Sequence, residues 1–161
     1  MTNEALGFLE NVQLFRGLSE DQLSAIVECA EVTWFDGGQA VTQADEPGAA
    51  AFLVLDGSVM VADESAPAGF QEPLGPGTLI GELAMLTEVT YVATVIAAEQ
   101  VRALAIARDA LYHVMEADPS IAEHLSGKLV RRLSRLADDL RSVDDRFEAL
   151  QVSLEAAADA A

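Results

Sequence analysis

The chain has 161 residues, and 51% of them are hydrophobic, which is enough to bury the core of one domain. Nine lysine and arginine residues stand against 27 aspartate and glutamate residues, so the formal net charge is −18. The negative electrostatic potential around such a protein repels nucleic acids and anionic lipid surfaces. We therefore expect neither nucleic acid nor membrane as a partner.

Cys29 is the single cysteine, so the chain can form no internal disulfide, and its apolar neighbours predict a buried thiol. The N-terminal stretch has no basic segment followed by an apolar run of the kind that directs secretion. No apolar run approaches the roughly 18 residues that a membrane-spanning helix needs. We therefore expect a cytoplasmic protein.

Two helices are predicted at the start of the chain. Apolar residues recur with helical spacing between residues 3 and 15, which predicts the first helix. Ser19 and Gln22 form the pattern of a capping box, in which each side chain bonds the backbone amide of the other. This pattern predicts a second helix that ends near Ala30.

Short strands separated by turn residues are predicted from residue 31 to residue 107. The apolar run Ala51–Leu55 predicts a buried strand, and Asp56-Gly57 predicts a tight hairpin to a strand over Ser58–Ala62. Residues 94–107 predict a second hairpin across Glu99-Gln100. A loop that holds three of the five prolines is predicted over residues 67–77.

The spacing of these turns decides the fold class. Turns every eight to twelve residues or so between short strands are typical of a sandwich or a barrel. We expect a mainly β fold with flanking helices, in which a jelly-roll (double-stranded β-helix) barrel carries N-terminal helices and a long C-terminal helix.

The segment Gly75–Val95 combines a turn, a one-turn helix and a strand. Gly81 lies directly before Glu82–Leu86, a run of good helix formers too short for an ordinary core helix. A one-turn helix behind a glycine presents unpaired backbone N–H groups. This is the geometry of a small anion cradle.

Gly81-Glu82-Leu83-Ala84, followed by Ala93-Thr94, resembles the phosphate-binding cassette of the cyclic-nucleotide-binding domain family. That family includes the catabolite-activator-type regulators and the regulatory subunits of cyclic-AMP-dependent kinase. The resemblance implies a cyclic AMP or cyclic GMP ligand, with Glu82 on the ribose 2′-hydroxyl and the amides of the short helix on the cyclic phosphate. The candidate binding residues are Gly81, Glu82, Leu83, Ala84, Tyr91, Ala93 and Thr94.

The family pattern also contains an arginine that neutralises the phosphate, in the order Pro-Arg-x-Ala-Thr. This chain has Thr90-Tyr91-Val92-Ala93-Thr94, and it has no lysine or arginine between Gly17 and Val101. A buried phosphate needs charge-assisted hydrogen bonds worth about 1.5–3 kcal/mol each, so we expect weak or lost affinity. Tyr91 would then fill the phosphate space, and its hydroxyl would bond Glu82 or the amides of the cradle.

An alternative keeps the chain a functional cyclic AMP or cyclic GMP sensor. The backbone amides and Glu82 would then hold the ligand together with an arginine from outside the cassette. Arg102 could bind the phosphate only if its strand directs its side chain into the pocket. An arginine at the start of the C-terminal helix serves if that helix lies over the barrel; the candidates are Arg131, Arg132 and Arg135.

The sequence offers no catalytic pattern. The two histidines, His113 and His124, fall beyond the predicted strands, so a metal site of the cupin type is not expected. Neither a Gly-x-Ser-x-Gly motif nor a phosphate-loop lysine occurs. We expect a non-enzymatic regulatory or sensor module without a metal ion.

Helical segments return after the strands. Asp109 is a candidate N-cap for a helix over Ala110–Ala117, and Asp118-Pro119 fits the start of a helix that runs on to the last residues. We expect the barrel and its N-terminal helices in residues 1–118 and a dimerisation helix of the same domain in residues 119–161. Since the helical pattern fills this last segment, no DNA-binding domain is expected.

Apolar residues repeat along the last helix in alternating steps of four and three, which is the heptad pattern of a coiled coil. This strict period favours a partner helix over packing on the barrel, so we expect a homodimer or a protein partner. The resemblance implies parallel pairing, although that pairing sets Asp139 beside the partner's Asp144. The residues of this heptad seam are Leu129, Leu133, Leu136, Leu140, Val143, Phe147, Leu150 and Leu154.

Overall fold

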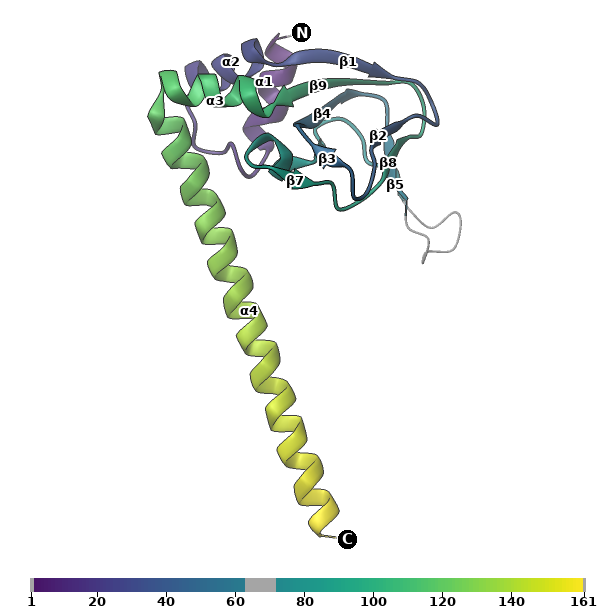
Figure 1. Ribbon diagram of the computed structural model, residues 1–161, viewed down its shortest axis with the longest axis vertical. Helices are drawn as coiled ribbons and strands as arrows, with labels where there is room; N and C mark the ends of the chain where they lie inside the picture. Colours follow the sequence, from purple (N-terminus) through teal and green to yellow (C-terminus); the bar gives the residue numbers. More distant parts are fainter. Residues whose placement is uncertain (1, 63–71, 161) are drawn as a thin grey trace. The chain divides into compact units, whose positions relative to one another are not determined.

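The structure is a computed structural model that describes residues 2–62 and 72–160 (Figure 1). It divides into two compact units, Met1–Ala122 and Glu123–Ala161. The first unit holds the strands and the shorter helices, and the second is the greater part of one long helix. The loop predicted over residues 67–77 lies partly outside the described residues.

The N-terminal helices are α1 (Thr2–Asn11) and α2 (Glu20–Cys29). α1 is shorter than predicted, because residues 12–17 form turns instead of continuing the helix. The capping box of α2 is confirmed: Ser19 Oγ accepts a hydrogen bond from Gln22 N at 3.2 Å, and Ser19 N donates to Gln22 Oε1 at 3.0 Å.

The described strands form three antiparallel sheets. The four-stranded sheet has the order β1-β9-β4-β6, the three-stranded sheet has the order β2-β8-β5, and β3 pairs with β7. This mainly β architecture with flanking helices confirms the predicted fold class. The strands are β1 (Glu31–Phe35), β2 (Ala40–Thr42), β3 (Pro47–Gly48), β4 (Ala50–Asp56), β5 (Val59–Val61), β6 (Leu79–Ile80), β7 (Val89–Thr90), β8 (Val95–Ala97) and β9 (Val101–Ala107).

Apolar side chains from both larger sheets form the core of the barrel. Val54 and Val101 come from the four-stranded sheet, Val59 comes from the three-stranded sheet, and all three are fully buried. The rings of Phe35 and Phe52 meet edge to face, with their centroids 5.6 Å apart. Side chains that alternate toward this core explain why such short strands are stable.

Both predicted hairpins are wrong, and the chain turns a corner at each place instead. β4 pairs with β9 and β5 pairs with β8, so the two strands on either side of each turn belong to different sheets. Gly57 has a φ of +84°, and a Cβ atom there would lie 2.3 Å from Gln100 O. The two corners therefore lie against each other. Turn residues alone do not distinguish a hairpin from such a corner, because both need the same backbone freedom.

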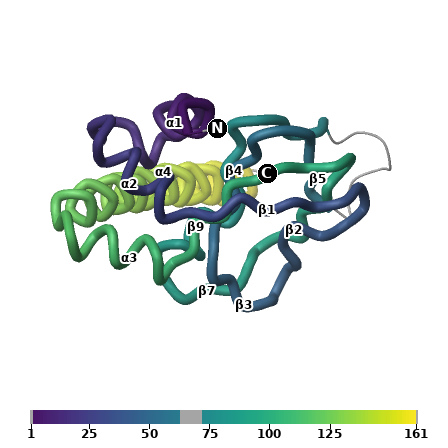
Figure 2. The backbone as a smooth tube through the Cα atoms, turned by 90° about the horizontal axis from the view of Figure 1, so that it is seen from above, coloured from purple at the N-terminus to yellow at the C-terminus, as the bar shows by residue number. Residues whose placement is uncertain are grey.

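The strands lead into α3 (Arg108–Ala117), and α4 (Pro119–Asp159) follows. Asp109 is not the N-cap that the sequence predicted, because the helix begins two residues earlier than expected, at Arg108 directly after β9, with Ala107 at the cap position. α2 and α3 pack against each other and against β9 (Figure 2).

Asp118 caps α4 as predicted. Its Oδ1 atom accepts a hydrogen bond from Ser120 N at 3.1 Å, and Pro119 is the first helical residue. The Ser120 hydroxyl and the Gln22 amide also donate to this carboxylate, and these bonds lower the pKa of Asp118. One carboxylate thus joins the start of α4 to the start of α2.

The second unit presents a row of apolar side chains on its surface. Most of the predicted heptad seam is exposed, and the exposed fraction ranges from 46% at Val143 to 70% at Leu154. Scattered exposed apolar residues are ordinary on a protein surface, but a continuous row along one helix face is typical of an interface. The exposed residues of the seam are Leu133, Leu136, Leu140, Val143, Phe147, Leu150 and Leu154.

Candidate functional site

The predicted one-turn helix is present as a 3₁₀ helix, η1 (Glu82–Met85), directly after β6. Gly81 precedes it with a φ of +70°, a left-handed conformation that a residue with a side chain rarely adopts. Ala84 and Met85 are buried beneath the turn, whereas Leu83 is 46% exposed. The one-turn helix predicted behind Gly81 is therefore present.

The ring of Tyr91 lies against two glycines, Gly81 directly before η1 and Gly48 in β3. A Cβ atom built at Gly81 would lie 2.7 Å from Tyr91 Cε1, and one built at Gly48 would lie 3.0 Å from Tyr91 Cε1 and Cζ. Contacts this short mean that the ring fills the space that the missing side chains leave open. Gly48 is buried in β3, so the cassette includes a third segment of chain that the sequence did not indicate.

The Tyr91 hydroxyl donates a hydrogen bond to Ala50 O at 2.8 Å. The sequence-based expectation that it would bond Glu82 or the amides of the cradle is therefore wrong. The reason is geometric: the ring lies against Gly81, and the carbonyl oxygen of Ala50 in β4 lies within reach of the hydroxyl, 3.4 Å from the same Cβ position.

The backbone of Tyr91 is also fixed. Tyr91 N donates to Glu46 O at 2.9 Å, and Asp45 N donates to Tyr91 O at 2.9 Å, next to the β3–β7 pairing of Pro47 with Thr90. Since backbone and hydroxyl are both bonded, the ring has a defined direction and is not a freely rotating surface side chain.

Ala93 and Thr94 bond a neighbouring segment of the chain. Thr94 Oγ1 accepts a hydrogen bond from Ala44 N at 3.0 Å, and Thr42 Oγ1 donates to Ala93 O at 3.0 Å. Thr42 is a buried polar residue, so its bond is needed to satisfy the hydroxyl. These two predicted site residues therefore hold the loop after β2 beside the cassette.

Arg108 is a cassette residue that the sequence did not reveal. Its Nη1 atom donates to three carbonyl oxygens, those of Gly48 at 2.9 Å, Thr87 at 3.0 Å and Ala84 at 3.1 Å. The Tyr112 hydroxyl donates to Leu86 O in the same region. The signal available in the sequence was the spacing of Arg108 and Tyr112, four residues apart on one face of α3.

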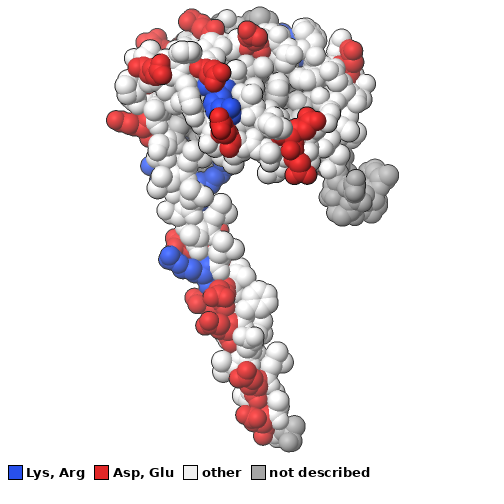
Figure 3. Space-filling view, viewed as in Figure 1, with Lys and Arg blue, Asp and Glu red and all other residues white. Residues whose placement is uncertain are grey.

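The positive charge of Arg108 is directed at carbonyl oxygens at the end of η1, and its bonds join the cassette to the start of α3. Arg102 points elsewhere, because its Nη2 atom lies 3.0 Å from a carboxylate oxygen of Glu4 in α1. Acidic side chains dominate the face of the first unit that Figure 3 displays. Glu82 is partly buried and adds a further negative charge to the cassette.

Residues 32–118 match the family described as the cyclic nucleotide-binding domain. The chain belongs to this family. The match covers the strands, η1 and α3, and so includes every contact of Tyr91 and Arg108 described above.

Solved structures agree with this assignment. The N-terminal domain of a transcriptional regulator from Streptomyces coelicolor A3(2) is similar with a TM-score of 0.72 and 26% identity, over 83% of this chain and 94% of that one. The Catabolite Activator Protein of Thermus thermophilus is similar with a TM-score of 0.62 and 26% identity, over 82% of this chain and 63% of that one.

Sequence relatives are longer proteins. The chain is 29% identical to mouse cGMP-dependent protein kinase 2 over 130 residues, which is 77% of this chain and 17% of the kinase. It is 28% identical to a CRP-like cAMP-activated global transcriptional regulator of Mycobacterium tuberculosis, over 82% of this chain and 60% of the regulator. The chain thus spans a minor part of the kinase, and the likeness carries over the domain and not the kinase activity.

Among residues 2–62 and 72–160, no three histidine, cysteine, aspartate or glutamate side chains gather closely enough to hold a metal ion. Within the same ranges, no helix has the length and the apolar character needed to cross a membrane.

Proposed function

We propose that this chain is a non-enzymatic regulatory module of the cyclic nucleotide-binding family that has weak or no affinity for cyclic nucleotides. It acts through dimerisation or through binding a protein partner. The observation that carries the proposal is the position of Tyr91, which stands where the family pattern has an arginine and lies against Gly81 and Gly48.

Tyr91 in place of the family's arginine weakens phosphate binding in two ways. The phosphate loses a charge-assisted partner worth about 1.5–3 kcal/mol per hydrogen bond. A phosphate that entered the space beside Gly81 where the ring lies would also have to move the tyrosine ring and break its bond to Ala50 O, which is worth about 1 kcal/mol. The nearby cation, Arg108, already bonds three carbonyl oxygens and is not directed at the cradle.

Calorimetric titration with cyclic AMP and cyclic GMP tests this proposal. We expect no sub-micromolar binding by the natural chain. Tyr91→Arg restores the family pattern and should increase the affinity. Thr90→Arg is the matched control, because it adds the same charge at an exposed neighbouring position. Sub-micromolar binding by the natural chain would overturn the proposed loss of affinity.

The exposed seam on α4 supports the dimerisation part of the proposal. A continuous apolar row with heptad spacing is stable in water when a second helix covers it. We expect sedimentation equilibrium to report a homodimer, and Leu140→Glu to shift it toward monomer. Ser134→Glu lies off the seam on the same helix and should leave the dimer intact. A natural chain that sediments as a monomer would refute the homodimer and leave partner binding as the proposed action.

A further inference from the structure

The charged residues beside the seam of α4 distinguish between the two orientations of a homodimer. We propose that two copies of α4 pair antiparallel, with Leu140 opposite the partner's Val143. This inference rests on the homodimer proposed above and specifies its geometry. It departs from the parallel pairing that the family resemblance implied.

The apolar positions allow this antiparallel register without a mismatch. In an antiparallel pair the a positions of one helix face the d positions of the other. The register sets Leu133 opposite the partner's Leu150 and Phe147 opposite the partner's Leu136, and symmetry repeats both contacts. The seam ends with Leu154 opposite the partner's Leu129. Every seam residue thus has an apolar counterpart, and the twofold axis passes between residues 141 and 142.

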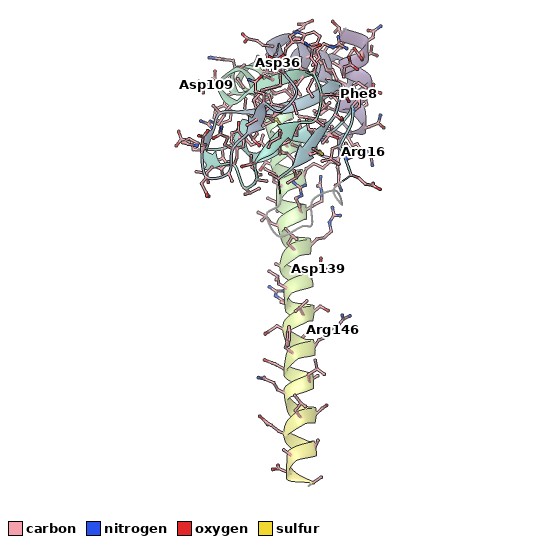
Figure 4. The ribbon with its side chains drawn as sticks, turned by 90° about the vertical axis from the view of Figure 1, so that its right-hand side faces the viewer. Phe8, Arg16, Asp36, Asp109, Asp139 and Arg146 are labelled. Carbon is pink, nitrogen blue, oxygen red and sulfur yellow. The ribbon has the colours of Figure 1, made fainter. Side chains whose placement is uncertain are left out.

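The flanking charges differ between the two orientations. Asp139 and Arg146 occupy successive g positions, are exposed, and project from the same side of α4 (Figure 4). In the antiparallel register g positions face each other, so Asp139 lies beside the partner's Arg146, and symmetry gives two attractive pairs. The e positions facing each other there are Ala137 and the partner's Asp144, a neutral contact.

Parallel pairing replaces both attractive contacts with repulsive ones. There g positions face e positions, so Asp139 lies beside the partner's Asp144 on both sides of the dimer. Arg146 would face the partner's Gln151 and would gain no ion pair. Like charges at such positions are destabilising by about as much as opposite charges are stabilising.

The wider distribution of charge favours the same orientation. Basic side chains lie along the first half of the second unit, and acidic side chains gather toward its end (Figure 3). Antiparallel pairing sets the mostly basic first half of one helix beside the mostly acidic end of the other. It also opposes the two helix dipoles, whereas parallel pairing aligns them.

Charge exchange at one position gives opposite results for the two orientations. In the antiparallel dimer Asp139→Arg places an arginine beside the partner's Arg146 on both sides of the dimer. The dimer Kd should therefore rise about fivefold at low salt. In a parallel dimer the same change creates two ion pairs with Asp144, and the Kd should fall. The exchange Asp139→Arg with Arg146→Asp should restore the natural Kd in the antiparallel dimer. Asp145→Arg, which changes the net charge equally at a position away from the seam, is the control.

A distance measurement on the full chain completes the test. A spin label at Ser153→Cys in a Cys29→Ser background reports the separation of the two labels by pulsed electron resonance. With a helical rise of 1.5 Å per residue, the antiparallel register predicts about 35 Å along the axis, and parallel pairing predicts about 20 Å or less. A short distance in a dimer would overturn the orientation alone. A monomeric natural chain in the sedimentation experiment would overturn the homodimer and the orientation together.

Discussion

Tyr91 and Ala50 lie 41 residues apart in the sequence, and the tyrosine hydroxyl donates a hydrogen bond to the alanine carbonyl oxygen at 2.8 Å. The bond crosses the left-handed turn at Gly81 and joins the segment after β7 to the first residue of β4. Two contacts of the tyrosine can therefore be tested independently, the packing of its ring against Gly81 and the bond of its hydroxyl to the backbone of β4.

Tyr91→Phe should keep the ring in place and remove only the hydroxyl. The free energy of unfolding should fall by about 1 kcal/mol, because the Ala50 carbonyl loses its partner. Urea denaturation followed by tryptophan fluorescence measures the change. If the proposed function holds, affinity for cyclic AMP should stay low, since the ring would still lie against Gly81. A clear gain in affinity would show that the hydroxyl and not the ring blocks the site.

Gly81→Ala should destabilise the cassette for two reasons. The left-handed φ of +70° costs a residue with a side chain about 1–2 kcal/mol, and the new Cβ atom would lie 2.7 Å from Tyr91 Cε1. Thermal unfolding of Gly81→Ala should therefore begin at a lower temperature. Combining it with Tyr91→Ala should relieve the steric part and leave the backbone strain. Gly75→Ala is the control, because a Cβ atom there has no neighbour within 4 Å.

Arg108→Ala should weaken the connection between α3 and the cassette. Three carbonyl oxygens lose a charged donor, which lowers the free energy of unfolding by about 2 kcal/mol. Hydrogen exchange should accelerate at the amides of Leu86 and Thr87, which both bond Leu83 O at the end of η1. Arg102→Ala removes only the partly exposed pair with Glu4, so its effect should stay below about 1 kcal/mol. Equal effects of the two variants would contradict the role assigned to Arg108.

Asp118 should give the fold a pH-dependent contribution. Hydrogen bonds from the Ser120 and Gln22 side chains lower the pKa of this carboxyl from its ordinary value of 3.8. The unfolded chain then binds the proton more readily, so the contribution is complete above the ordinary pKa and is lost as the pH falls below it. Asp118→Asn lacks this titration. The difference in unfolding free energy between the two chains should therefore shrink on acidification, and a difference that grows would contradict the assignment.

Local sequence signals predicted several features that depend on neighbouring residues, although the N-cap expected at Asp109 was wrong. The capping box of α2, the N-cap at Asp118 and the one-turn helix after Gly81 each involve residues close together in the chain, and each is present. Their chemistry is decided within one turn of backbone, so short patterns suffice to find them.

Features that depend on distant segments were predicted poorly. The sequence could not reveal the acceptor of the Tyr91 hydroxyl, because Ala50 bonds through its backbone and any residue there offers the same carbonyl. Arg108 was missed for the same reason, since its three acceptors are all backbone atoms. The turn residues at Gly57 predict a hairpin, but β5 pairs with β8 and not with β4. This pairing is decided by the packing of two sheets, which turn residues do not reveal.

The position of the Tyr91 ring against Gly81 limits which signals the module can respond to. In the proposed function the Tyr91 ring takes the place of a ligand. Because this ring is part of the chain, its amount does not change with the concentration of any metabolite. Such a domain would not follow the level of a second messenger. The quantity left for it to sense is its own abundance, through the balance between single and paired chains.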